Sequence, residues 1–460
     1  MLSQALLTRW RQFTTGTVNR EIIGAAFTIG LVTSLVKVIS FFKEAFIAGI
    51  FGITTDLDAF IFAFTFVSFF LDLLLNALQS SFIPVFAQIE NRGIPLYAQR
   101  FLANTFTFLL IGIVGMIILF IGVLPQMLRV IAYGFSPEKQ ALTLSLIWGL
   151  IPYFFLRGLS TLCHGVLQAG KRFGFSSLVP VFTPLVTIFL LLLSGSSWGV
   201  RVLVWATVIG AGIELIALQF ALARRGYHLR LTWEPINSDL RRVFLQTGAL
   251  MGGTLMMGST TLVDQAMASG LDAGSIAGLN FGNKIPSLLI TVTATALATA
   301  ILPYFSEMVA RQDWEGCRHT LKRYTQLLLL TSVPLVTVLI LISEPLVRLI
   351  FQRGAFDTQA AHLVAGIQQA YLLQVPSYLI GILAVRLISA MGKNQILTFV
   401  AGVNMVLNVV FNWWFMQIWG VYGIALSTSM VYLVSTILCM GFVTKLLNKN
   451  ERNKSNERHG

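Results

Sequence analysis

Five basic residues lie inside segments of this chain that are otherwise apolar: Lys37, Lys43, Arg157, Lys284 and Arg386. A basic side chain in the middle of a bilayer costs about 2.5–3.5 kcal/mol on insertion scales. Such residues usually face a water-filled cavity or bind a group of opposite charge. The sequence therefore predicts a membrane protein with a basic internal cavity that suits an anionic cargo.

The segments that hold these residues are long enough to cross a membrane. Hydrophobic residues make up 56% of the 460 residues and charged residues only 11%, whereas about 25% of a soluble chain is charged. About 20 apolar residues span the hydrocarbon core. We therefore expect an all-α integral membrane protein with about twelve spans, near 24–51, 58–88, 101–123, 141–169, 175–195, 199–223, 243–268, 273–305, 324–342, 362–391, 395–417 and 419–445.

The net charge of +13 is distributed unevenly along the chain. With the N-terminus in the cytosol, the predicted cytosolic side holds 22 of the 32 Lys and Arg residues, the outer loops hold 5, and the other 5 lie inside spans. This asymmetry follows the positive-inside rule and predicts that both termini are cytosolic. The basic charge is explained by topology, so no nucleic-acid partner is expected.

The two halves of the chain resemble each other at an offset of about 220 residues. The matching pairs are Leu57-Asp58-Ala59 with Leu271-Asp272-Ala273, Ala169-Gly170-Lys171 with Met391-Gly392-Lys393, and Trp198-Gly199-Val200 with Trp419-Gly420-Val421. Six spans per half predict two bundles related by a pseudo-two-fold axis along the membrane normal, with a central cavity. The alternative is a chance match between apolar segments.

This repeat predicts how the chain is organised. We expect a cytosolic lead-in at 1–21, a first six-helix bundle at 22–225, a basic cytosolic linker at 226–242, a second bundle at 243–445 and a disordered cytosolic tail at 446–460.

Polar residues recur at helical spacing in three of the spans. These stripes are Thr33, Lys37, Ser40 and Glu44; Asp58, Thr65, Ser68, Asp72, Asn76 and Gln79; and Asn280, Lys284, Ser287 and Thr291. Residues three or four apart share one helix face. The charged stripes favour a cavity lining, and ion pairs with Glu44, Asp58 or Asp72 are an expected means of neutralising some of the lysines. For the lone Ser and Thr residues, hydrogen bonds between helices are the favoured alternative.

A second polar cluster could bind a hard cation. Asn404, Asn408 and Asn412 recur every four residues, and Asp264, Ser427 and Thr428 lie in other spans. Oxygens from several helices can replace the hydration shell of an ion such as Na⁺. Packing of helices by asparagine is the alternative explanation.

Motifs for enzymatic chemistry are missing from the sequence. It holds no Gly-rich loop of the kind that cradles ATP phosphates, and its five histidines do not have the spacing of a metal site. His164 aligns in the repeat with Arg386 and is expected to serve packing. We therefore expect no enzymatic activity and no cofactor other than a coupling Na⁺ ion.

Two segments resemble a known family. The run Lys37-Val38-Ile39-Ser40-Phe41-Phe42-Lys43-Glu44, followed by Ile50-Phe51-Gly52 and Asp58-Ala59-Phe60, and the run from Glu344 to Phe356, EPLVRLIFQRGAF, are similar to the MurJ (MviN) lipid II flippases. These flippases belong to the multidrug/oligosaccharidyl-lipid/polysaccharide exporter superfamily.

The resemblance implies roles for particular residues. Lys37, Lys43, Lys284 and Arg386 correspond to basic residues thought to meet the pyrophosphate and the head group of an undecaprenyl-linked precursor of peptidoglycan. Asp58 corresponds to an acidic residue at the start of the second span, and Asp72 stands where the family has a basic pair. The cation site described in some members maps to Asp264, Asn404, Asn408 and Thr428.

The implied function is the movement of lipid II from the inner to the outer leaflet of the bacterial inner membrane. The expected mechanism is alternating access by a monomer, driven by the membrane potential or an ion gradient. Members usually have fourteen spans against the twelve expected here, so a flippase for another lipid-linked oligosaccharide is one alternative. A multidrug or cation antiporter on the same fold is another.

Overall fold

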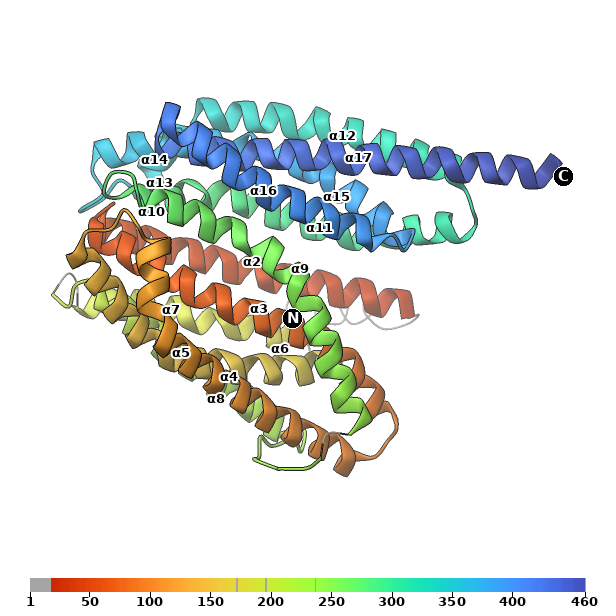
Figure 1. Cartoon of the computed structure of the whole chain (residues 1–460), viewed down its shortest axis with the longest axis horizontal. Helices are drawn as coiled ribbons and strands as arrows, with labels where there is room; N and C mark the ends of the chain where they lie inside the picture. Colours follow the sequence, from red (N-terminus) through yellow and green to blue (C-terminus); the bar gives the residue numbers. More distant parts are fainter. Residues whose placement is uncertain (1–17, 171–172, 195–196, 236, 460) are drawn as a thin grey trace, which may run out of the picture. The chain divides into compact units, whose positions relative to one another are not determined.

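The computed structural model describes residues 18–170, 173–194, 197–235 and 237–459, and the regular structure in these residues is helical (Figure 1). The helices are α2 (Val18–Phe51), α3 (Thr55–Asn91), α4 (Pro95–Ile131), α5 (Pro137–Ala169), α6 (Phe173–Leu178), the short 3₁₀ helix η1 (Val179–Val181), α7 (Phe182–Ser194), α8 (Arg201–Ala223), α9 (Ser238–Ala268), α10 (Ser275–Gly282), α11 (Lys284–Ala310), α12 (Trp314–Leu341), α13 (Ser343–Phe351), α14 (Thr358–Leu372), α15 (Gln374–Ala390), α16 (Asn394–Trp419) and α17 (Val421–His459).

The helices coincide with the predicted spans. Nine helical segments in the described part of the chain are long and apolar enough to cross a membrane. The other three predicted spans, near 24–51, 243–268 and 273–305, coincide with α2, α9 and the α10–α11 pair. The predicted all-α integral membrane fold is confirmed.

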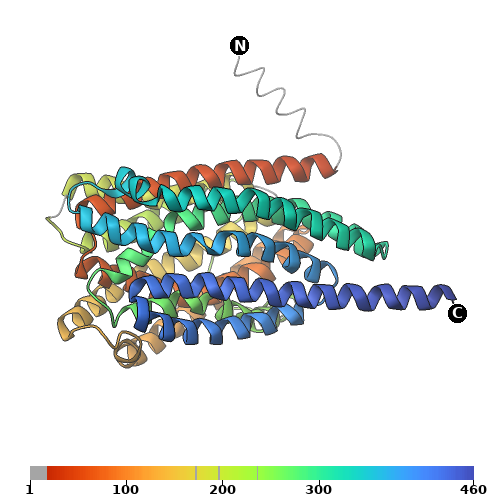
Figure 2. The same ribbon diagram turned by 90° about the horizontal axis from the view of Figure 1, so that it is seen from above.

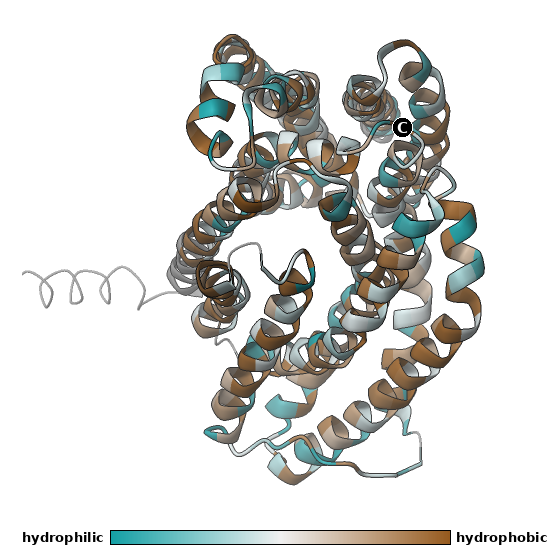
Figure 3. Cartoon of the chain, turned by 90° about the vertical axis from the view of Figure 1, so that its left-hand side faces the viewer, coloured by the Kyte–Doolittle hydropathy of each residue, from teal (hydrophilic) through white to brown (hydrophobic). Residues whose placement is uncertain are grey.

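Many residues of the long helices are coloured as hydrophobic in Figure 3, and large apolar side chains on several of these helices are exposed. On α16, Val406, Val410 and Trp413 are spaced four and three residues apart, and Val406 and Trp413 are 63% and 62% exposed. Residues at this spacing form one continuous face. Lipid is the solvent in which such a face is stable, since a contiguous apolar surface of this kind is rare on soluble proteins.

Proline interrupts two of the spans at matching positions. Pro286 lies two residues after the start of α11, and Pro376 lies two residues after the start of α15. Each proline lacks the N–H that would bond to the last residue of the preceding helix, and its ring crowds that carbonyl. The two breaks are neighbours, because Gln374 Nε2 donates to Asn283 Oδ1 at 3.5 Å.

The described residues form two compact units that are not continuous in sequence. Unit 1 comprises the described residues of 1–43, 70–124 and 147–251, and unit 2 those of 44–69, 125–146 and 252–460. This division differs from the predicted one, which placed all of 22–225 in the first bundle. The segments 44–69 and 125–146 belong instead with the second half of the chain.

Close backbone contacts inside unit 2 explain this difference. A Cβ atom on Gly134 would lie 2.3 Å from the Cα of Gly270, and one on Gly52 would lie 2.5 Å from the backbone oxygen of Ala355. Only glycine permits such an approach, and Gly52 also has a φ of 61°, which other residues rarely adopt. These contacts pack 44–69 and 125–146 against the second half, and a repeat in the sequence cannot indicate them.

The predicted tail and linker also differ from the structure. The prediction of a disordered tail from residue 446 is wrong, because α17 continues to His459, as Figure 2 shows. Leu447 is buried and Arg318 of α12 binds Glu451, so this part of α17 is held by packing and charge. The last five residues of the predicted linker, 238–242, belong to α9. Most of the predicted lead-in, 1–17, lies outside the described residues.

Candidate functional site

Lys284 occupies the helix break of unit 2. It is the first residue of α11, and its Nζ lies 3.1 Å from Glu44 Oε1 of α2. The Lys284 side chain is 26% exposed and that of Glu44 is 13% exposed. The lysine ammonium favours a negatively charged partner, and in this structure Glu44 supplies it.

Arg386 lies on α15, well away from Lys284. It follows Gln374, the neighbour of the α11 break, by twelve residues, which corresponds to about 18 Å along a helix. Its Nε is buried and has no hydrogen-bond partner among the described residues. The two predicted cavity bases of unit 2 therefore occupy different depths, and a single small anion cannot contact both.

Three predicted residues of unit 1 lie on faces of differing exposure. Lys37 on α2 is exposed, and Lys43, six residues later, is half-buried. Asp72 on α3 is exposed, as are Asn76 and Ser80 at four-residue intervals. A carboxylate on a membrane-length helix is stable on such a face only where the face is wet. The exposed positions on α3 are therefore expected to contact water, and the cavity lining predicted for this stripe stays a prediction.

Asp58 is held by protein groups on both of its oxygens. Oδ2 accepts from Lys139 Nζ at 3.0 Å and from the Gly274 N–H at 2.7 Å, and Oδ1 accepts from the Ala277 N–H at 2.7 Å. The carboxylate is 1% exposed. In this geometry it joins α3, α5 and the start of α10, so its contacts stabilise the fold. Its predicted role in substrate binding stays a prediction.

The expected ion pairs form with partners other than those closest in sequence. Glu44 pairs with Lys284, although Lys37 lies two turns away on its own helix. Asp58 pairs with Lys139, which was expected in an outer loop and lies in α5. No spacing in the sequence indicates either pair, because each joins helices that are distant along the chain.

Several hydroxyl groups of the polar stripes bond within their own helix. Ser40 donates to the Val36 carbonyl, and Thr291 donates to the Ser287 carbonyl. Thr65 instead accepts from Gln265 Nε2 of α9 at 2.8 Å. The interhelical role expected for lone hydroxyls is therefore confirmed for Thr65, while Ser40 and Thr291 satisfy backbone carbonyls.

The predicted cation cluster is assembled around Asp264 in unit 2. Asp264 Oδ1 accepts from Asn408 Nδ2 at 2.9 Å and from Asn412 Nδ2 at 2.6 Å, and Oδ2 accepts from Thr428 Oγ1 at 3.2 Å. Asn404 donates instead to Ser435 Oγ at 2.9 Å. Three of the four residues given by the resemblance converge, and Asn412, which the four-residue spacing had marked, completes the set.

Several buried oxygens on α16 and α17 have no hydrogen-bond partner in the part of the chain that the structure describes. The Oδ1 atoms of Asn404, Asn408 and Asn412 and the hydroxyl of Ser427 are buried without a hydrogen-bond partner among the described residues. Buried acceptors of this kind are rare in native proteins and need an explanation. One carboxylate with several amide oxygens is a ligand set that suits a hard cation, so the residues present fit a Na⁺ ion.

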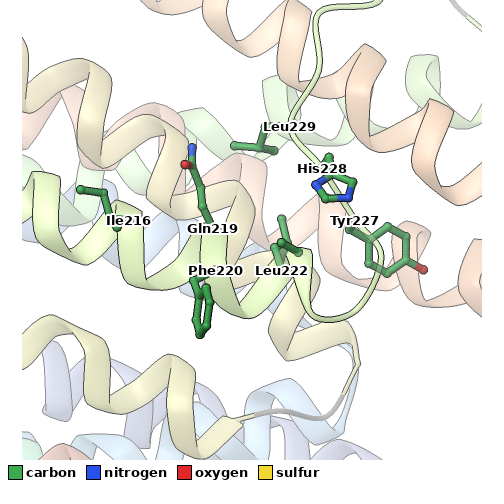
Figure 4. A pocket seen from close by; sticks show the side chains of 8 residues that line it. Ile216, Gln219, Phe220, Leu222, Tyr227, His228 and Leu229 are labelled. Atoms are coloured by element: carbon green, nitrogen blue, oxygen red, sulfur yellow. The ribbon is translucent and has the colours of Figure 1, made fainter.

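A pocket of about 350 Å³ lies elsewhere, in unit 1 at the end of α8. Figure 4 shows Gln219 and Phe220 on α8 and Tyr227 and His228 on the loop that follows. None of the predicted site residues lines it. The pKa of Tyr227 is raised, first by burial and then by the neighbouring Glu90 carboxylate. The pocket is lined by the end of α8 and the loop after it, and no lysine, arginine or carboxylate is among its lining residues.

The helical fold and the charges along its spans define a multi-span membrane transporter. A solved lipid II flippase MurJ in an inward closed conformation matches 92% of this chain and 90% of its own chain, with a TM-score of 0.79 and 20% sequence identity. An inward-facing multidrug resistance MATE family transporter of the MOP superfamily covers 93% of this chain and 99% of its own, with a TM-score of 0.77 and 13% identity. These likenesses show the fold that this chain shares.

The family is shown by sequence. The family model described as lipid II flippase MurJ matches residues 47–456. A probable lipid II flippase MurJ of Rickettsia prowazekii is 23% identical over 424 residues, which are 91% of this chain and 83% of the relative. One from a Synechocystis species is 24% identical over 450 residues, 94% of this chain and 83% of the relative. The chain belongs to the lipid II flippase MurJ family, and the resemblance predicted from its two motifs is confirmed.

Proposed function

We propose that this chain is a flippase that moves lipid II from the inner to the outer leaflet of the bacterial inner membrane. The observation that carries the proposal is the match to the lipid II flippase MurJ family over residues 47–456. The relatives in that family are named as probable lipid II flippases. Neither the polysaccharide alternative nor the antiporter alternative receives comparable support, and no enzymatic step is needed.

The chemistry of unit 2 supports an anionic head group as the cargo. Lys284 provides a positive charge at the start of α11, where it already pairs with a carboxylate. It pairs with the Glu44 carboxylate, whose Oε1 lies 3.1 Å from Nζ. A pyrophosphate carries the same kind of charge as Glu44 and can replace it. Loading of the cargo then exchanges one partner of Lys284 for another without leaving the ammonium unpaired.

Arg386 supports a cargo of extended shape. Its position, about 18 Å along α15 from the break, requires a ligand longer than a phosphate to reach both bases. Its buried Nε without a partner is an available donor. A pyrophosphate attached to sugars and a peptide has the necessary length, with acceptor groups along it.

The distribution of basic residues supports the orientation. The 22 basic residues on one side of the membrane against 5 on the other favour cytosolic termini. With the inside negative, a potential of 100 mV favours outward movement of each negative charge by about 2.3 kcal/mol. The proposed transport therefore uses the potential across the membrane, with alternating access as the mechanism and one chain as the working unit.

Na⁺ is proposed as a coupling ion in unit 2. Asp264 would hold it together with Asn408, Asn412 and Thr428, which already gather on that carboxylate. When bound, the ion supplies a positive charge that neutralises Asp264 and binds the amide oxygens. These residues come from α9, α16 and α17, so the same ion ties three helices together.

Replacement of Lys284 tests the proposal. K284A should abolish rescue of a bacterial strain depleted of its own lipid II flippase, while membrane insertion measured in isolated membranes stays normal. K284R keeps the charge and should restore most of the rescue. K393A, at an exposed lysine in the α15–α16 turn, is the matched control and should behave as the unchanged chain. Full rescue by K284A, or failure of the unchanged chain to rescue, would overturn the assignment.

A further inference from the structure

A group of buried titratable side chains in unit 1 has no part in the proposed lipid site. His164 Nε2 lies 3.0 Å from Glu214 Oε1, and His164 Nδ1 lies 2.7 Å from the Ser176 hydroxyl. Arg157 Nη1 donates to the same Glu214 oxygen at 3.2 Å. His164, Ser176 and Glu214 are all less than 9% exposed. The Glu214 carboxylate joins α8 to α5, and His164 joins α5 to α6.

The hydrogen bonds around His164 can be satisfied in both of its protonation states. With neutral imidazole, Nε2–H donates to Glu214 and the Ser176 hydroxyl donates to Nδ1. With imidazolium, Nδ1–H donates and the same hydroxyl oxygen accepts. A serine hydroxyl rotates between these roles without moving the helices. The site can therefore gain a proton without losing a hydrogen bond. A histidine that only holds helices together does not need a partner that can both donate and accept.

The charges that face this site are out of balance by one. Asp72 of α3 lies close enough to Arg157 for the two charges to interact, so the set comprises the carboxylates of Asp72 and Glu214 and one guanidinium. From α5, Tyr153 also faces Arg157 and is neutral. In sequence, residues 101–128 of α4 and all of α7 contain no titratable side chain, and α6 contributes only the hydroxyl of Ser176.

We propose that His164, Glu214 and Ser176 form a proton-binding site in unit 1, with Arg157 and Asp72 setting its charge. Two negative charges and one positive leave a net charge of −1 when His164 is neutral. A proton on His164 makes the set neutral. The buried negative charge of the set is that of Glu214, 3.0 Å from Nε2, whereas Asp72 acts from the exposed face of α3. Arg157, whose side chain is 36% exposed, is the member of the set that meets the surroundings.

This inference goes beyond the flippase activity. It gives the chain a second ligand, H⁺, in a unit distinct from the one that holds the proposed Na⁺ site. A site that binds a proton responds to the pH on the side of the membrane that it contacts. The expected consequence is transport that depends on the pH gradient as well as on the potential.

Nuclear magnetic resonance of the full chain, labelled with ¹⁵N-histidine and held in detergent, measures the proton directly. The chain has five histidines, and H164Q identifies the signal of His164 by its loss. We expect that signal to change from neutral imidazole to imidazolium as the pH is lowered from about 8 to 5. In E214Q the proton should bind at least about tenfold more weakly, since an adjacent negative charge is removed.

Two further variants separate a proton site from a structural contact. D72N touches neither His164 nor Ser176 in any hydrogen bond, yet it corrects the charge imbalance and should also weaken proton binding. E344Q removes a carboxylate that faces a different histidine, His362, and should leave the His164 signal unchanged.

The inference is overturned if His164 stays neutral down to pH 5, or if both E214Q and D72N titrate as the unchanged chain does. D72N keeps the test decisive should E214Q fail to fold. The measurement does not depend on transport, so its failure would leave the flippase proposal standing. Loss of rescue by K284A would likewise leave the proton site untouched.

Discussion

Replacement of Asp58 by asparagine gives the sharpest test of how unit 2 is held together. The carboxylate is 1% exposed and receives a bond from Lys139 Nζ at 3.0 Å and two from backbone N–H groups at 2.7 Å. D58N removes the charge and one of the two acceptor oxygens. Lys139, whose side chain is only 10% exposed, is then left without its anion.

The expected loss of stability follows from that geometry. Removing one member of a buried ion pair typically costs about 3–5 kcal/mol, because the remaining charge is left unpaired. K139M should cost less, about 1–3 kcal/mol, since the backbone N–H groups of Gly274 and Ala277 still stabilise the carboxylate. The double variant D58N/K139M has no unpaired charge. It should therefore be less destabilised than the sum of the single changes, by at least about 1 kcal/mol.

Equilibrium unfolding in mixed detergent micelles, followed by tryptophan fluorescence, measures these differences for all three variants. Strict additivity, or a loss below about 0.5 kcal/mol for D58N, would refute the stabilising role of the pair. A D58N chain of unchanged stability that no longer rescues a flippase-depleted strain would instead place Asp58 in substrate binding, as its position in the sequence predicted.

Two other predictions concern a close backbone contact and the cation cluster. Both Gly52 and Gly93 have positive φ, but a Cβ on Gly52 would meet Ala355 whereas one on Gly93 would meet nothing within 4 Å. G93A should lower the free energy of unfolding by about 1–2 kcal/mol, and G52A by about 1–3 kcal/mol more because of overpacking. Equal losses of stability in the same unfolding assay would contradict this account. Na⁺ at 100 times its dissociation constant should stabilise the unchanged chain by about 2.7 kcal/mol, and K⁺ should not. D264N should abolish this stabilisation. Equal stabilisation of D264N by Na⁺ would exclude Asp264 as the ligand.

Much of the fold could be predicted because the bilayer limits the choices. Every backbone group in the hydrocarbon core must bond within the chain, so long apolar runs become helices. Each of the twelve predicted spans accordingly coincides with a helix or with consecutive helices. The disordered tail was predicted from its polar composition alone. Polar composition indicates solvent contact, and α17 continues through it as a helix because Arg318 and Leu447 fix its position against α12 and the core.

The candidate site could be predicted in its residue types but only partly in its contacts. Lys284 and the residues around Asp264 were identified from charge and spacing, since ionised or amide side chains in a membrane need a partner. The repeated motifs Lys284-Ile285-Pro286-Ser287 and Gln374-Val375-Pro376-Ser377 were present in the sequence as well. These matching motifs mark the two helix breaks at Pro286 and Pro376.

The sequence by itself determined the membrane spans, the excess of basic residues on one side and the family to which the chain belongs. Only the tertiary structure decided the partner of each buried charge: Glu44 binds Lys284, 240 residues away, and Asp58 binds Lys139. The reason is physical. Hydropathy acts on each segment separately, whereas an ion pair depends on the packing that brings two distant helices within about 3 Å of each other, and residue spacing along one helix carries no information about that packing.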